Sequence, residues 1–128
     1  MNRLDGKIAI ITGASKGLGE ADSRLFIEEG ARLILTDIDK EAGEALAKEL
    51  GENAEFIYQD VRDEQGWITL IDDVVARYGG LDVLVNNAGV VQPGTIESQT
   101  MDEYDFIMDV SARATFMGCK YALSLIHI

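Results

Sequence analysis

The sequence predicts an α/β fold built on a parallel sheet, and three observations indicate it. Short apolar runs rich in β-branched residues alternate along the chain with longer runs of helical periodicity. A glycine-rich turn, residues 12–19, follows the first apolar run and precedes a helical one. A second turn, residues 86–89, follows the fourth apolar run. Because parallel strands are buried on both faces and are joined by crossovers, this order favours helices on both sides of one sheet.

The first two strands are predicted over 7–12 and 33–37, where short, mostly apolar runs need cover on both faces. Between them the spacing of apolar residues predicts a helix over 17–29 that Gly30 ends. The apolar face of this helix is expected to comprise Leu18, Ala21, Leu25 and Phe26.

The rest of the chain repeats the same alternation. The further elements are predicted as a helix over 40–50 with Asp39 as its N-cap, a strand over 54–58, a helix over 64–78 with Trp67 in its packing stripe, and a strand over 82–86. A loop over 90–99 then leads to Thr100 and Glu103, which have the spacing of a capping box. This box predicts a last helix that runs as far as Tyr121.

Composition excludes several classes of partner and site. The 128 residues include 23 acidic and 11 basic side chains, a net charge of −12, which disfavours nucleic acid and anionic membrane surfaces as partners. One cysteine, Cys119, excludes an internal disulfide, and no metal site is expected. No charged-then-apolar leader opens the sequence, and no apolar run approaches the roughly 20 residues that span a bilayer. A cytoplasmic location is therefore expected.

The glycine-rich turn has the spacing Gly13-x-x-x-Gly17-x-Gly19 between a strand and a helix. Gly13 can take backbone angles closed to other residues, and the later glycines lack a Cβ, so that a ligand and a neighbouring strand can come close. Free N–H groups at the start of a helix suit the pyrophosphate of a dinucleotide. The simpler interpretation is an ordinary strand-to-helix turn. We prefer nucleotide binding because this spacing, placed between a strand and a helix, is a more specific pattern than a lone glycine triplet.

Together with Asn86-Asn87-Ala88-Gly89, this spacing resembles the short-chain dehydrogenase/reductase family of NAD(P)-dependent oxidoreductases. The resemblance implies a Rossmann-type doubly wound parallel sheet that is truncated here, with the strand order 3-2-1-4 and later strands missing. Residues 1–122 would then be the amino-terminal part of an NAD(P)-binding domain, because the chain has about half the usual length of the family.

The cofactor residues follow from the motifs and from the resemblance. Asp37 ends the second strand, where a carboxylate can accept hydrogen bonds from the adenosine ribose and repel a 2′-phosphate. This favours NAD over NADP, although Lys16 argues the other way. By resemblance alone, Asp60 and Val61 border the adenine ring. The predicted cofactor-binding residues are Gly13, Ser15, Lys16, Gly17, Leu18, Gly19, Asp37, Ile38, Asp60, Val61, Asn87, Ala88, Gly89 and Val110.

The catalytic residue that the resemblance implies in this chain is Ser111. The family has Asn in a context like Val-Asn-x-Arg, and this chain reads Val-Ser-Ala-Arg over 110–113. Three interpretations are open: Ser111 is a working variant, it weakens the proton relay, or it marks a non-catalytic relative. A serine hydroxyl, like an asparagine amide, both donates and accepts hydrogen bonds, which supports the first. We favour the first.

The family's catalytic Ser and its Tyr-x-x-x-Lys come from later elements, and Lys120 and Tyr121 lack that spacing. The parent is expected to be a homo-oligomer that interconverts a secondary alcohol and a ketone, whereas this chain alone is expected to be inactive. The alternative is a non-catalytic NAD(P)-binding regulator on the same fold. A methyltransferase-like binder of another adenosine cofactor is disfavoured by the glycine spacing.

The last six residues, 123–128, form the tail Leu-Ser-Leu-Ile-His-Ile. One set of codons for them, CTG TCT CTT ATA CAC ATC, resembles a transposon end used to prepare sequencing libraries. We expect a non-native tail, in which His127 has no function. The alternative is a genuine helix end, because these residues are compatible with a helix.

Overall fold

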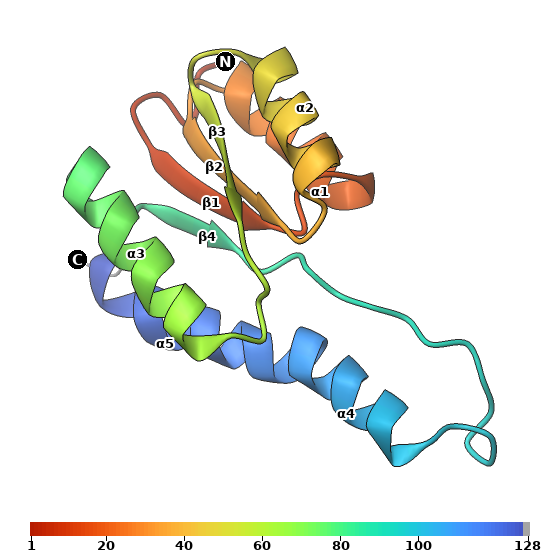
Figure 1. The fold of residues 1–128 in the computed structure, drawn as a ribbon. Coiled ribbons are helices and arrows are strands. Elements are labelled where there is room, and N and C mark those ends of the chain that lie inside the picture. Colours follow the sequence, from red (N-terminus) through yellow and green to blue (C-terminus); the bar gives the residue numbers. More distant parts are fainter. Residues whose placement is uncertain (127–128) are drawn as a thin grey trace.

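Four parallel strands form one sheet in the order β3-β2-β1-β4, as drawn in Figure 1. In the computed structural model, which describes residues 1–126, the strands are β1 (Ile8–Thr12), β2 (Arg32–Asp37), β3 (Ala54–Tyr58) and β4 (Val83–Val85). The predicted order 3-2-1-4 is confirmed. Each predicted strand is present, with ends that differ by at most one residue.

Helices cover both faces of the sheet, which makes the fold a Rossmann-type α/β architecture (Figure 1). One face carries α1 (Gly17–Glu28) and α2 (Lys40–Leu50), and the other carries α3 (Glu64–Tyr78) and α5 (Ala114–Ile126). Side chains of β1 alternate between the two cores: Ile11 packs on the side of α2, and Ile10 on the side of α3. Both isoleucines are fully buried, as expected for a strand covered on both faces.

Helix α1 uses a different face from the predicted one. Leu18 is 77% exposed and Leu25 is 46% exposed, whereas Gly19 and Ser23 are the buried residues of this helix. Ala21 is exposed as well. A Cβ on Gly19 would lie only 2.2 Å from the carbonyl oxygen of Gly13. The prediction for the apolar face was therefore wrong at Leu18, Ala21 and Leu25, because small residues let α1 lie close against the turn that follows β1.

The last helical region is continuous but changes its pitch. The predicted capping box is confirmed: Glu103 N–H donates to Thr100 Oγ1 at 3.1 Å, and Thr100 N–H donates to Glu103 Oε2 at 2.8 Å. Helix α4 (Met101–Met108) then passes through a π-helical turn, η1 (Asp109–Arg113), into α5. Thr115 Oγ1 donates to the Ser111 carbonyl at 2.7 Å within this region. Such side-chain bonds to the backbone bend helices, and periodicity alone did not predict the π turn.

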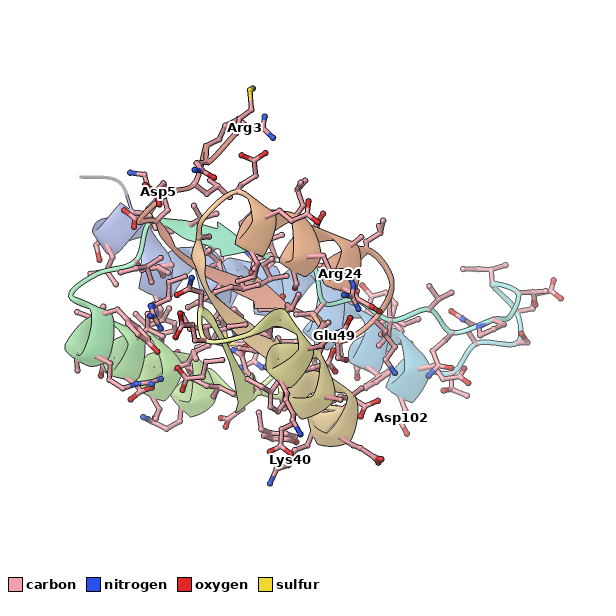
Figure 2. The ribbon with its side chains drawn as sticks, turned by 90° about the horizontal axis from the view of Figure 1, so that it is seen from above. Arg3, Asp5, Arg24, Lys40, Glu49 and Asp102 are labelled. Carbon is pink, nitrogen blue, oxygen red and sulfur yellow. The ribbon has the colours of Figure 1, made fainter. Side chains whose placement is uncertain are left out.

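Charged side chains cover the outer surface of the helices. Figure 2 shows Arg24 of α1 beside Glu49 of α2, and their closest atoms are 2.8 Å apart. Arg24 also pairs with Glu20 at 2.7 Å. Pairs exposed to solvent in this way contribute little stability each, so the cores carry the fold.

Helix α5 includes the first four residues of the predicted non-native tail, Leu123 to Ile126, and the remaining two, His127 and Ile128, lie outside the described residues. The foreign origin of the tail stays a prediction.

Within residues 1–126, no helix has the length and apolar character that crossing a membrane requires. The same residues contain no cluster of three His, Cys, Asp or Glu side chains arranged to hold a metal ion.

Candidate functional site

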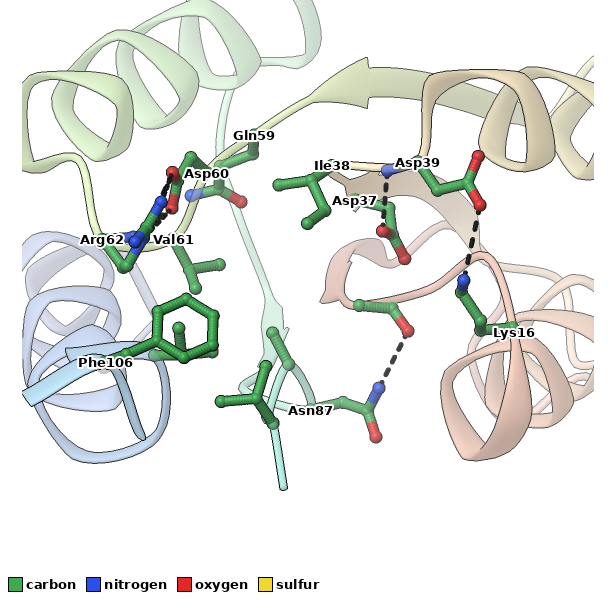
Figure 3. A pocket seen from close by; sticks show the side chains of 15 residues that line it. Lys16, Asp37, Ile38, Asp39, Gln59, Asp60, Val61, Arg62, Asn87 and Phe106 are labelled. Atoms are coloured by element: carbon green, nitrogen blue, oxygen red, sulfur yellow. Dashed lines mark hydrogen bonds and ion pairs between the residues drawn. The ribbon is translucent and has the colours of Figure 1, made fainter. Parts of the chain in front are cut away.

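A pocket of about 570 Å³ lies at the carboxyl ends of the strands, bordered on one side by α4 and η1 (Figure 3). Ligands of open α/β sheets bind at this edge. The pocket is lined by Gly13, Lys16, Asp37, Ile38, Asp39, Gln59, Asp60, Val61, Arg62, Asn87, Ala88, Gly89, Val90, Phe106 and Val110. Residues from the glycine-rich turn and from the ends of β2, β3 and β4 therefore meet in one place.

The backbone of the glycine-rich turn requires glycine for two different reasons. Gly13 and Gly17 both have φ of +60°, in the left-handed region that other residues rarely adopt. A Cβ on Gly13 would also lie 2.9 Å from the Cα of Ala88, whereas open space surrounds Gly17. Gly19 has no unusual φ, but it packs against the turn itself. The turn thus approaches the segment after β4 through Gly13 and keeps free space beside Gly17.

The start of α1 is left without a side-chain cap. Lys16 occupies the N-cap position and makes no capping hydrogen bond. Among the described residues, the N–H groups of Gly17, Leu18 and Gly19 have no hydrogen-bond acceptor. These donors and the positive end of the helix dipole suit an anion. The side chain of Leu18 is exposed to solvent, so only its backbone N–H is available to such an anion.

Asn87 ties the end of β4 to the glycine-rich turn. Its Nδ2 donates to the carbonyl oxygens of Thr12 and Gly13, each at 3.0 Å. The Thr12 hydroxyl in turn accepts the N–H groups of Asn87 at 3.1 Å and Ala88 at 3.0 Å. Asn87 thus joins the ends of β1 and β4 where the strand pairing stops.

Asp37 is held in position at the end of β2. Its carboxylate accepts the Ser15 hydroxyl at 2.6 Å, the Ser15 N–H at 3.1 Å and the Asp39 N–H at 3.0 Å. Burial raises the pKa of Asp37, but the hydrogen bonds from Asp39 and Ser15 outweigh burial and hold this pKa below its ordinary value. Asp37 is therefore a fixed negative charge in the wall of the pocket, and Ser15 helps to hold it there.

Lys16 forms an ion pair with Asp39, 3.4 Å from Nζ to Oδ2 (Figure 3). Asp39 also caps α2 by accepting the Ala42 N–H at 3.1 Å, as predicted. The sequence did not indicate that Asp39 also lines the pocket. Because both side chains of this pair are well exposed, the pair is weak and Lys16 can leave it.

The wall at the end of β3 is built around a second ion pair. Arg62 donates to Asp60 through its backbone N–H and its side chain, with Nη2 at 2.7 Å from Oδ2. The hydrogen-bonded guanidinium beside Asp60 holds the pKa of that carboxyl below its usual range. The same guanidinium lies over the ring of Phe106, 5.2 Å from its centroid. Trp67 Nε1 fixes the backbone by donating to the Val61 carbonyl at 2.8 Å.

Comparison with known proteins identifies the family. The model of the short chain dehydrogenase family matches residues 7–127 of the chain. The chain belongs to the short-chain dehydrogenase family. The predicted resemblance is thereby confirmed over nearly the whole sequence.

Individual short-chain dehydrogenases and related proteins agree with this assignment. The chain is 37% identical over 123 residues to a 3-beta-hydroxysteroid dehydrogenase of Comamonas testosteroni, covering 96% of the chain and 48% of that protein. It is 40% identical over 124 residues to tropinone reductase-like 1 of Erythroxylum coca, covering 94% and 46%. It is 43% identical over 126 residues to the sex determination protein tasselseed-2 of Zea mays, covering 94% and 38%. The chain spans about half the length, or less, of these relatives.

The short-chain dehydrogenase motifs do not all reach the pocket. Ten of the predicted cofactor residues line it, from Gly13 at the turn to Val110 in η1. Ser15, Gly17, Leu18 and Gly19 belong to the turn and the start of α1 instead. Ser111 is half-buried and is not among the lining residues, although its neighbour Val110 is.

Sequence reasoning missed five lining residues as parts of the site: Asp39, Gln59, Arg62, Val90 and Phe106. Phe106 carried a usable signal, because it lies four positions before Val110 and four positions place two side chains on one face of a helix. Val90 and Arg62 follow predicted motifs directly in the sequence. Nothing in the pattern around Gln59 marks it as more than the end of a strand.

Proposed function

We propose that this chain is the cofactor-binding part of an NAD-dependent oxidoreductase whose whole protein interconverts a secondary alcohol and a ketone. One observation carries the proposal: the glycine-rich turn, Asp37, the segment 60–61 and the segment 87–89 border a single pocket. Membership of the short-chain dehydrogenase family supports a nicotinamide dinucleotide as the ligand. Relatives named as a hydroxysteroid dehydrogenase and a tropinone reductase-like protein support the alcohol and ketone chemistry.

The residues of the chain suit each part of such a dinucleotide. Unpaired N–H groups over 17–19 would hold the pyrophosphate without a side-chain charge. The Asp37 carboxylate would accept hydrogen bonds from ribose hydroxyls, because three donors already use only part of its acceptor capacity. Apolar side chains of Val61 and Val110 would cover a flat base.

The charges around the pocket favour NAD over NADP. Asp37 is fixed by its hydrogen bonds, and a 2′-phosphate at the ribose would meet this charge at close range. Lys16 is a feature in favour of NADP, and its Nζ is paired with Asp39. The Lys16–Asp39 pair is exposed and weak, so Lys16 can also turn into solvent, whereas three hydrogen bonds hold the Asp37 carboxylate in place. Asp37 therefore decides the preference.

The dinucleotide, when bound, supplies or accepts the hydride, and the protein contributes binding, orientation and proton transfer. In this chain Asn87 maintains the shape of the turn that would hold the phosphates. Ser111 lies in η1, next to the pocket residue Val110, where its hydroxyl can take part in a proton path. The general acid/base of the family comes from later residues, so the chain alone is proposed to bind without turnover.

Binding and turnover test the proposal separately. The full reading frame that contains this chain is expressed, and unfolding is followed with NADH, NADPH and S-adenosylmethionine. We expect the largest rise in Tm with NADH, since a ligand that binds only the folded state stabilises it. No rise with either nicotinamide dinucleotide refutes the binding. Cofactor-dependent oxidation of a panel of secondary alcohols then tests the reaction, and binding without turnover would favour the regulator.

A further inference from the structure

Gln59 is buried, yet its side-chain amide has no hydrogen-bond partner among the described residues. The residue follows β3 and is only 5% exposed, and both Oε1 and Nε2 are unpaired. Its backbone is fixed, because its N–H donates to the Asp37 carbonyl at 3.1 Å. A buried amide without a partner costs free energy, and native proteins keep few such groups. The position of this amide therefore calls for an explanation.

The amide lies in the wall of the pocket, at the end proposed to hold the base. Gln59 lines the pocket, and Figure 3 shows it between the group of Asp60 and Val61 on one side and Ile38 on the other. Its neighbours Ile38 and Val61 are apolar, which suits the two faces of a flat aromatic ring. This end of the pocket is thus an apolar slot with an unpaired amide buried in its wall.

The other polar side chains at this end already have partners. Asp60 accepts three donor groups of Arg62, and Asp37 accepts the hydrogen bonds of Ser15 and Asp39. Within the described part of the chain, Gln59 is the pocket residue that offers both a buried free donor and a buried free acceptor. The last side-chain torsion of glutamine is broad, so that turning the amide toward a ligand costs little.

We propose that Gln59 is a specificity-determining residue that recognises the adenine base of the dinucleotide. Oε1 would accept from the exocyclic amino group, and Nε2 would donate to the ring nitrogen N7 on the same edge, which is the paired contact that glutamine makes with adenine elsewhere. The inference rests on the proposed function and adds a residue that the family motifs do not assign. Hypoxanthine presents an oxygen in place of the amino group, so it would leave Oε1 unpaired.

A buried water offers the competing explanation. Thr36 Oγ1 is the other buried side-chain oxygen without a partner in residues 1–126, and Thr36 is fully buried in the neighbouring strand β2. Thr36 is not a lining residue of the pocket. A water joining this hydroxyl to the Gln59 amide would satisfy both groups without any ligand. Thr36→Val, which keeps the shape of the side chain, is therefore a matched control.

The test uses protein from the full reading frame, with Gln59→Met as the variant closest in shape and Gln59→Leu as a second one. Calorimetry gives Kd for NADH and for the analogue with hypoxanthine, and thermal unfolding without ligand gives Tm. We expect both Gln59 variants to bind NADH roughly five- to tenfold more weakly, from the loss of about one hydrogen bond to the base. Their discrimination against hypoxanthine should fall, while their Tm without ligand is unchanged or higher.

Each other outcome has a distinct meaning. If the Gln59 variants bind NADH like the wild type, the proposal for Gln59 is overturned although the proposed function stands. If Gln59→Met and Thr36→Val both lower the Tm and neither changes binding, the amide serves a buried water. If the wild type binds neither dinucleotide, the proposed function itself fails, and the inference fails with it. Equal losses of affinity for AMP and for nicotinamide mononucleotide would also overturn recognition of the base.

Discussion

Replacing Gly19 with alanine tests the close contact between α1 and the glycine-rich turn. The new Cβ would lie 2.2 Å from Gly13 O, 2.6 Å from Asn87 Nδ2 and 2.9 Å from Ala14 Cα. The first two atoms are the acceptor and donor of one hydrogen bond, 3.0 Å long. Two of the three contacts are with backbone, so rotation of a side chain cannot relieve them.

The expected loss of stability follows from three contributions. Overpacking of a tight site costs about 1–3 kcal/mol. Breaking the hydrogen bond between Asn87 and Gly13 costs about 1 kcal/mol more. Alanine regains about 1 kcal/mol relative to glycine within a helix. The last two contributions cancel, so that Gly19→Ala should lower the free energy of unfolding by about 1–3 kcal/mol.

Urea unfolding of the wild type and two variants measures this loss. Gly66→Ala is the matched control, because Gly66 is the third residue of α3 just as Gly19 is the third residue of α1. A Cβ on Gly66 approaches the Asp63 side chain at 3.0 Å, and that side chain can turn away. We expect Gly66→Ala to match or exceed the wild type. The reasoning is refuted if Gly19→Ala is as stable as Gly66→Ala.

Three further predictions concern charge and proton transfer. Asp37→Ala should reduce the preference for NAD over NADP in kcat/KM, and an unchanged preference would assign the ribose contact to another residue. Glu29 accepts the Arg3 N–H, which lowers its pKa from 4.5 to about 2, so its stabilisation is present above pH 4.5 and is lost as the pH falls toward 2. Glu29→Gln should therefore lower the Tm at neutral pH, with a difference from the wild type that vanishes near pH 2. Because Ser111 is expected to be a working variant, Ser111→Asn should leave both Kd for NADH and kcat nearly unchanged, and a marked rise in kcat would show instead that the serine weakens the proton relay.

The order of the elements was predictable because the signals for it are local. The six residues from Lys7 to Thr12 are enough to indicate a buried strand, and the glycines after them indicate the turn. Asp39 and Thr100 mark helix starts by a side-chain chemistry that acts within three residues. These predictions hold because each depends on neighbours in the sequence.

Features that depend on distant partners were not predictable from the pattern. The periodicity of α1 suggested that Leu18 and Leu25 face the core, but the approach to Gly13 instead selected Gly19 and Ser23 for the buried face. The same holds in the pocket. Asp60 was assigned by the family resemblance, whereas the packing of its partner Arg62 over Phe106 depends on where α4 lies. The unpaired state of Gln59 is likewise a property of the assembled fold.

The hydrogen bonds of Asn87 have a consequence for the growing chain during synthesis. The side chain reaches back 75 residues to Thr12, so that the turn between β1 and α1 acquires its support only after β4 has been made and has paired with β1. Contacts between residues so distant form late, because closing a long loop costs conformational entropy before the contact contributes any stabilisation. An emerging chain that ends before residue 87 has the glycines but not the amide that joins them to β4. Under the proposed function, the dinucleotide would thus stabilise by mass action those nascent chains whose first and fourth strands have already paired.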